Sequence, residues 1–343
     1  MKRLVIASIR KSAGKTSVSL GLTKATAKNV AYMKPLGDRL LYRKKRLWDH
    51  DAALVTKVFG LEVSPENVSL GFEHQKLRYM YDRETTREKL LEMAEELETG
   101  KELLLVEAGA ELSSGASVHL DSLTLCRWLE AKLLVVLDGD ENSIMDDLYF
   151  LKNSVDTSGI PLAGVVINKL KDIEDFAVTQ LPAIENLGIP VLGLLPWQPE
   201  LGQLTVGYLA DKLFAKIIAA EDRVERPVKH IFVGAMSASM AQKNPLFKKE
   251  DKVIITSGDR SDMILAALET GSAAIILTNS ILPPPSIISR AAREGVPLLL
   301  LSSDTFLTAK HIDDMEPLVS PGDNEKIKLL AEMARSRLSL DEF

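Results

Sequence analysis

Short apolar runs recur along the first 200 residues, and most precede a stretch in which apolar positions repeat with helical spacing. Continuous runs rich in Val, Ile and Leu are typical of parallel strands that helices cover on both faces. The runs are Arg3–Ala7, Val30–Met33, Glu102–Val106, Lys132–Leu137, Gly164–Ile167 and Val191–Leu195. Helices are expected between them, most clearly over Thr85–Thr99, Asp146–Val155 and Val178–Leu187. The pattern predicts an α/β fold built on a parallel sheet.

A second alternating series follows a charged stretch that ends at Pro227. Its predicted strands are His230–Gly234, Lys252–Ile255, Ala273–Leu277 and Pro297–Leu301. Its predicted helices are Ser261–Thr270, Ser286–Arg293 and Asn324 to about Leu338. We therefore expect two domains, 1–223 and 224–343, of which the second is a smaller α/β domain closed by the C-terminal helix. The length of 343 residues agrees with this, at about 150 residues per domain.

The composition excludes several classes of protein. Lys and Arg number 42 against 48 Asp and Glu, a formal net charge of −6, which argues against a nucleic-acid binder. The single cysteine, Cys126, excludes an intramolecular disulfide and is expected in a helix core. No apolar run is long enough to span a bilayer, and the N-terminal run is too short for a signal peptide. We expect a cytoplasmic protein that binds neither nucleic acid nor membrane.

The first predicted strand leads into residues 8–17, which read SIRKSAGKTS, and then into a predicted helix. A phosphate-binding loop has the pattern G-x-x-x-x-G-K-[ST] between a strand and a helix. Gly14, Lys15 and Thr16 fit this pattern, whereas Ile9 stands at the first glycine position. Such a loop would hold nucleotide phosphates and Mg²⁺, and a chance Gly-Lys-Thr turn is the alternative. The predicted nucleotide contacts are Arg10, Lys11, Ser12, Ala13, Gly14, Lys15, Thr16 and Ser17.

A second lysine and two acids are predicted near the same edge of the sheet. Lys34 follows the strand Val30–Met33, Glu107 follows the strand Glu102–Val106, and Asp51 stands where a helix should begin. Ligands of open α/β sheets bind at the carboxyl ends of the strands. Thr16, Asp51 and Glu107 would together form an oxygen-only Mg²⁺ site. A helix cap for Asp51 and an exposed loop acid for Glu107 are the alternatives.

Six segments within about residues 1–215 resemble dethiobiotin synthetase in order and spacing: SIRKSAGKTSVSLGL, YMKPLG, HDAALV, VEAGA, VVINKL and PVLGLLPW. They resemble still more the N-terminal region of long phosphate acetyltransferases, above all in KTSVSLGL. The resemblance implies a P-loop NTPase domain that binds ATP and Mg²⁺. It also implies that Lys34 lies beside the substrate carbamate or its equivalent. The residues it assigns to the nucleotide base are Asn168 and Lys169, which read the base, and Pro196 and Trp197, which flank it.

The second half resembles the DRTGG domain over roughly residues 225–335. The likeness is carried by HIFVGAMSA from residue 230, VIITSGDRSD from residue 253 and GVPL from residue 295. In long phosphate acetyltransferases this domain lies between the synthetase-like region and the catalytic domain. Since the chain ends at Phe343, acetyl transfer to coenzyme A is not expected of it.

Two further features leave alternatives open. Arg39, Arg43, Lys44, Lys45 and Arg46 could clamp a polyanionic ligand, or they could form a solvated helix face with Leu40, Leu41 and Leu47 turned inward. The turn Gly258–Arg260 could bind an anion at a helix start, or it could be a turn capped by Asp259.

Three functions fit these observations. The first is an ATP–Mg²⁺-binding regulatory or sensor protein, whose second domain transmits the nucleotide state or joins subunits. The second is an ATP-dependent carboxylase, ligase or kinase acting on a small anionic metabolite, with Lys15 and Lys34 as catalytic residues. The third is a subunit that modulates a separate acyltransferase. A homodimer is expected by analogy with other parallel-sheet nucleotide-binding proteins.

Overall fold

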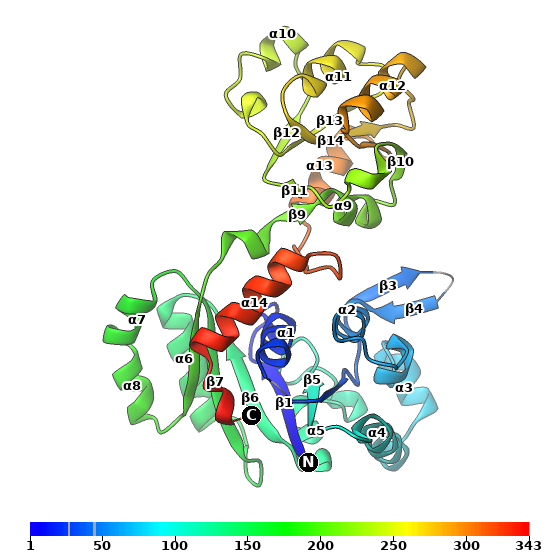
Figure 1. Ribbon diagram of the computed structural model, residues 1–343. Helices are drawn as coiled ribbons and strands as arrows, with labels where there is room; N and C mark the ends of the chain where they lie inside the picture. The colour runs from blue at the N-terminus through cyan, green and yellow to red at the C-terminus, as the bar shows by residue number, and fades with distance from the viewer. Residues whose placement is uncertain (27, 44–45, 343) are drawn as a thin grey trace. The chain divides into compact units, whose positions relative to one another are not determined.

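The computed structural model describes residues 1–26, 28–43 and 46–342 (Figure 1). These residues form two compact units, 1–198 with 324–343, and 199–323. The predicted domains 1–223 and 224–343 differ from these units in two places. The division lies about 25 residues earlier in the chain, and the C-terminal segment belongs to the first unit.

A six-stranded parallel sheet forms the centre of the first unit. The strands are β1 (Lys2–Ser8), β2 (Val30–Met33), β5 (Leu103–Glu107), β6 (Lys132–Leu137), β7 (Leu162–Leu170) and β8 (Val191–Pro196). Their order is β2-β5-β1-β6-β7-β8. All neighbours run parallel, and the register pairs Ile6 of β1 with Glu107 of β5. The predicted parallel sheet is therefore confirmed, with all six predicted strands.

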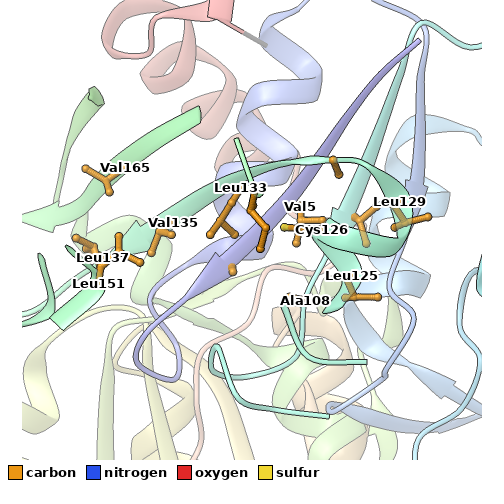
Figure 2. Close-up of a cluster of buried hydrophobic side chains, with 14 of the residues drawn as sticks. Val5, Ala108, Leu125, Cys126, Leu129, Leu133, Val135, Leu137, Leu151 and Val165 are labelled. Atoms are coloured by element: carbon orange, nitrogen blue, oxygen red, sulfur yellow. The ribbon is translucent and has the colours of Figure 1, made fainter. Parts of the chain in front are cut away.

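Apolar side chains on one face of this sheet pack against helices α4 (Arg83–Glu98), α5 (Ser122–Leu129), α6 (Glu141–Asn153), α7 (Ile173–Thr179) and α8 (Leu181–Asn186). Figure 2 shows Val5, Leu133 and Val135 of the strands gathered with Cys126 of α5. Cys126 is buried, and burial raises the pKa of its thiol to about 12, as expected for a core residue. The single helix predicted over Val178–Leu187 is wrong, because two short helices meet at Gln180, with a proline in the first turn of the second.

Helix α14 (Asn324–Arg337) packs against α1 (Lys15–Ala25), so it does not close the second unit as predicted. The two helices approach closely at Gly21, where a Cβ atom would lie 2.7 Å from the carbonyl oxygen of Leu330. After the helix, the Ser339 N–H donates to the Leu192 carbonyl of the edge strand β8 at 2.9 Å. The remaining elements of this unit are α2 (His50–Phe59), α3 (His74–Met80) and an antiparallel hairpin of β3 (Leu40–Arg43) and β4 (Arg46–Asp49).

The second unit is a five-stranded sheet in the order β10-β15-β14-β13-β12. Strands β12 (His230–Val233), β13 (Lys252–Ser257), β14 (Ser272–Thr278) and β15 (Leu298–Leu300) run parallel, and β10 (Lys216–Ala219) is antiparallel. One face packs against α10 (Ala238–Ala241), α11 (Ser261–Leu268) and α12 (Pro285–Glu294). The other packs against α9 (Val206–Lys212) and α13 (Thr305–Asp313). A two-stranded sheet of β9 (Leu204–Thr205) and β11 (Pro227–Val228) completes the unit.

The position of the division follows from these contacts. Helix α9 contributes Val206, Leu209 and Ala210 to the core of the second unit, and β10 pairs with β15. The charged stretch that was predicted to separate the domains therefore connects two elements of the same unit.

We predict that Gly21→Ala destabilises the first unit. Alanine is favoured over glycine within a helix by about 1 kcal/mol, but here its methyl group would meet the backbone of α14. Overpacking of this kind costs about 1–3 kcal/mol. Urea denaturation followed by tryptophan fluorescence measures this unit alone, because Trp48, Trp128 and Trp197 all lie in it.

Gly207→Ala is the matched control, since Gly207 also lies in a helix but a Cβ there would be 3.4 Å from its nearest neighbour. Circular dichroism should show no loss of stability for this variant. An unchanged urea midpoint for Gly21→Ala would contradict the close helix packing.

Candidate functional site

The predicted phosphate loop connects the end of β1 to the start of α1. Gly14 has a φ of 98°, and a Cβ atom at this position would lie 2.2 Å from Nδ2 of Asn168. The backbone conformation therefore favours glycine, and a side chain here would require the Asn168 side chain to shift. Ile9, at the usual position of the first glycine, instead packs against the apolar core beneath the sheet. The loop residues with positive φ are Ser12 and Gly14, so the turn is made without a glycine at residue 9.

Lys15 is the first residue of α1 and is 7% exposed. Its Nζ donates to the Ser8 hydroxyl at 2.9 Å and to the Ala110 carbonyl at 3.0 Å. Burial lowers the pKa of Lys15, and the nearby Glu107 carboxylate opposes that shift. The ammonium thus lies at the carboxyl edge of the sheet, between the end of β1 and the loop after β5.

Thr16 and Glu107 are in direct contact. The Thr16 hydroxyl donates to Glu107 Oε1 at 2.7 Å, and the Tyr32 hydroxyl donates to Oε2 at 3.1 Å. Glu107 is 1% exposed, so the alternative of an exposed loop acid is wrong. Burial and the neighbouring carboxylates raise the pKa of Tyr32 well above its usual value, which keeps its hydroxyl protonated as a donor.

Lys34 lies among four carboxylates and is 1% exposed. Its Nζ is 2.6 Å from Asp51 Oδ2 and 2.7 Å from Asp38 Oδ1. Asp49 Oδ1 at 3.4 Å and Glu107 Oε1 at 3.7 Å complete the group. Burial alone would lower the pKa of Lys34, but the carboxylates outweigh it and raise this pKa well above its usual value.

Asp51 is buried in the first turn of α2. Burial alone would raise the pKa of its carboxyl group, but Lys34, His50 and Arg39 hold it well below its usual range. The predicted metal ligands Asp51 and Glu107 therefore meet around one nitrogen atom, and Thr16 donates to the same Glu107 oxygen that lies near this nitrogen. The helix cap considered for Asp51 is instead formed by Asp49.

Asp49 is a site residue that the sequence did not reveal as one. Its Oδ1 accepts from the backbone N–H groups of Asp51 and Ala52, and its Oδ2 accepts from those of Asp38 and Arg39. It both caps α2 and fixes the chain that follows Lys34. An aspartate directly before a predicted helix is the signal that would have found it.

Three residues predicted to contact the nucleotide hold the phosphate loop in place. The Arg10 guanidinium pairs with both carboxylate oxygens of Asp147, at 2.8 and 3.0 Å. Asn168 Nδ2 donates to the Ala13 carbonyl at 2.9 Å. Lys169 Nζ donates to the Ser12 carbonyl at 2.5 Å and to Asp138 at 2.9 Å. These contacts fix the loop backbone from α6, β7 and the end of β6.

Three other residues predicted to contact the nucleotide are Lys11, Pro196 and Trp197, and their side chains make fewer contacts with the phosphate loop. Lys11 is exposed, and within the part of the chain that the structure describes no ion pair involves it. Pro196 ends β8 and is in register with Leu170 at the end of β7. The Trp197 N–H donates to the Leu170 carbonyl at 2.8 Å, while its indole is 52% exposed.

Of the basic stretch, Arg43 and Arg46 lie in the paired strands β3 and β4, so the alternative of a helix face is wrong. The two strands pair in the antiparallel direction, with Leu40 opposite Asp49. Arg39 lies 3.4 Å from Asp51, and Arg46 pairs with Glu66 at 3.2 Å. Lys44 and Lys45 lie outside the described residues, and Arg43 is in β3.

In the second unit, the turn Gly258–Arg260 joins β13 to α11. Its glycine is required because a Cβ would collide with the Ile281 carbonyl, at 1.7 Å. Arg260 donates to the Met236 carbonyl at 2.8 Å, and the Ser261 N–H donates to the Asp259 carbonyl. The first bond links the turn to the chain after β12, and the second closes the turn itself.

None of the helices in the described ranges is both long and apolar enough to cross a membrane.

Two family models match consecutive parts of the chain. The AAA domain model AAA_26 matches residues 2–205, and the DRTGG domain model matches residues 208–315. Phosphate acetyltransferase of Synechocystis sp. is 25% identical over 344 residues, which are 95% of this chain and 49% of the relative. The enzyme of Pseudomonas aeruginosa is 23% identical over 96% of this chain and 49% of its own length. The chain thus spans about half the length of these curated relatives.

Solved structures show weaker likenesses. The MinC:MinD cell division protein complex of Aquifex aeolicus is 17% identical, over 59% of this chain and 84% of that chain, with a TM-score of 0.38. The CBS and DRTGG domains of the Clostridium perfringens pyrophosphatase regulatory region, complexed with the activator diadenosine tetraphosphate, are 24% identical. That match covers 35% of this chain and 50% of the other, with a TM-score of 0.30.

The matched ranges and the observed folds agree, since the first model covers the sheet with the phosphate loop and the second covers most of the second unit. The chain belongs to the AAA domain family, carries a DRTGG domain after it, and is related to the N-terminal part of phosphate acetyltransferases.

Proposed function

We propose that the first unit binds ATP together with Mg²⁺, and that the chain is a regulatory protein whose DRTGG domain responds to the nucleotide. The observation that carries the proposal is the loop before α1. Gly14 there allows close backbone approach, Lys15 supplies a buried positive charge at a helix start, and Thr16 supplies a hydroxyl. The internal partners of Lys15 Nζ, a hydroxyl and a carbonyl, are neutral, so phosphate oxygens would bind it more strongly.

The charges around the loop suit a divalent cation. Four carboxylates lie within 3.7 Å of Lys34 Nζ, and the other cationic side chains close to them are Lys15 and Arg39. Three of these carboxylates, those of Asp49, Asp51 and Glu107, are buried, and their donor atoms are oxygens, which Mg²⁺ prefers. Thr16, Asp51 and Glu107 would hold the ion, whose charge would offset that of the phosphates. Asn168, Lys169 and Arg10 would hold the loop in the conformation that binds the phosphates.

We predict that Lys15→Met weakens ATP–Mg²⁺ binding about 100-fold, because the charged hydrogen bonds to the phosphates are lost. Isothermal titration calorimetry of the full chain measures this directly. Lys76→Met, on the exposed surface of α3, is the matched control and should bind as the wild type does. Equal affinity of the wild type and Lys15→Met, or no binding to either, would contradict the proposal.

Thr16→Val should remove the metal-dependent part of the affinity. Valine keeps the shape of the side chain but lacks the hydroxyl that now donates to Glu107. ATP affinity measured with Mg²⁺ and with EDTA should differ strongly for the wild type and little for this variant. Thr16→Ser keeps the hydroxyl and should retain the difference. If ATP affinity still differed strongly between Mg²⁺ and EDTA in Thr16→Val, Thr16 would be excluded as a metal ligand.

The regulatory role requires a response in the DRTGG domain. Hydrogen–deuterium exchange of the full chain, with and without ATP–Mg²⁺, should show altered protection within residues 208–315 in the wild type and none in Lys15→Met. A change restricted to residues 1–198 would support nucleotide binding but contradict regulation through the second domain. Phosphate release stimulated by a small anionic metabolite would favour the enzyme hypothesis instead.

A further inference from the structure

The Lys34 ammonium lies where a cation shared by Asp51 and Glu107 would lie. Its Nζ is 2.6 Å from an Asp51 oxygen and 3.7 Å from a Glu107 oxygen, and the same Glu107 oxygen accepts from Thr16. These are the three residues assigned above to the metal. The side chain is 1% exposed, so the ammonium lies among the acids and away from solvent.

A divalent cation and this ammonium cannot both lie between the same two carboxylates, because like charges at such separations repel strongly in a buried site. Metal binding at Thr16, Asp51 and Glu107 therefore requires the ammonium to shift.

The surroundings offer Lys34 a second set of partners. Asp38 Oδ1 at 2.7 Å and Asp49 Oδ1 at 3.4 Å are also close to its Nζ, and neither acid belongs to the assigned metal ligands. Asp49 is fixed by four backbone N–H groups, whereas the Asp38 side chain is 28% exposed at the mouth of the cluster. With metal bound, Asp38 and Asp49 would thus pair with the ammonium, while Asp51 and Glu107 would bind the metal.

We propose that Lys34 is a built-in competitor of the divalent cation, which takes the cation's place when nucleotide is absent and makes metal binding depend on nucleotide. Phosphate oxygens arriving with the metal give the displaced ammonium an additional anionic partner and offset the added charge. The free protein then has little affinity for the metal alone. This inference rests on the proposed ATP–Mg²⁺ site and concerns the order in which that site fills.

The test uses Mn²⁺ alone as the probe, with the full chain and no nucleotide, and measures the free-ion signal by electron paramagnetic resonance. Glu107→Gln defines background binding, because it removes an assigned ligand. The wild type should match this background. Lys34→Gln, whose amide can still donate to the carboxylates, should bind Mn²⁺ at least about tenfold more tightly than the wild type.

Melting temperatures supply a second readout. Mn²⁺ should raise the melting temperature of Lys34→Gln much more than that of the wild type, because it replaces the lost positive charge. Lys252→Gln is the matched control. Lys252 is also a buried lysine, but its Nζ donates to the carbonyls of Lys249 and Thr270, so Mn²⁺ should not rescue that variant.

Two results would overturn the inference. One is saturable Mn²⁺ binding by the wild type without nucleotide that Glu107→Gln abolishes, a result that needs no Lys34 variant to fold. The other is a Lys34→Gln variant that folds and binds Mn²⁺ no more tightly than the wild type. Either can occur while calorimetry shows wild-type ATP–Mg²⁺ binding, which separates failure of this inference from failure of the proposed function.

Discussion

The balance between one buried ammonium and four carboxylates determines how the carboxyl edge of the six-stranded sheet is built. Buried carboxylates are costly unless they are paired, and Lys34 is within 4 Å of all four. The acids come from the chain after β2, the start of α2 and the end of β5, and the parallel sheet brings these segments to one edge. Asp49 adds order by binding four backbone N–H groups. The charge cluster therefore fixes the conformation of the loops that surround the phosphate loop.

The phosphate loop itself is held by side chains that at first resemble ligands. Arg10 is paired with Asp147, and Asn168 and Lys169 donate to loop carbonyls. A loop restrained in this way loses little conformational freedom when a ligand binds, which favours binding. Gly14 has a backbone conformation that favours glycine and lies close to the Asn168 side chain, whereas Ile9 packs against the apolar core.

The sequence predicted most of the fold because the apolar strand runs are continuous and buried, and a phosphate loop has a local pattern. It also predicted that Lys34, Asp51 and Glu107 share an edge, since each stands at a strand end or a helix start. It missed Asp49, the β3–β4 hairpin and the anchoring role of Asn168. The Asn168 contact joins segments 155 residues apart, which local periodicity does not report, whereas Asp49 and the hairpin depend on turn and cap contacts within about ten residues that apolar periodicity does not report. In particular, apolar and polar residues do not alternate in the sequence of residues 39–46, so this sequence does not distinguish strands from a helix.

The division of the chain required tertiary contacts for the same reason. The buried positions of α14, such as Leu330 and Ala334, would suit the core of either unit, and the contacts of the helix with α1 and β8 assign it to the first. The DRTGG-containing unit is thus inserted between the sheet of the first unit and one of its covering helices. That helix packs on α1, which begins with Lys15 and Thr16. The chain therefore passes at residue 323 from the second unit directly into a helix that packs on the helix opened by the predicted phosphate loop.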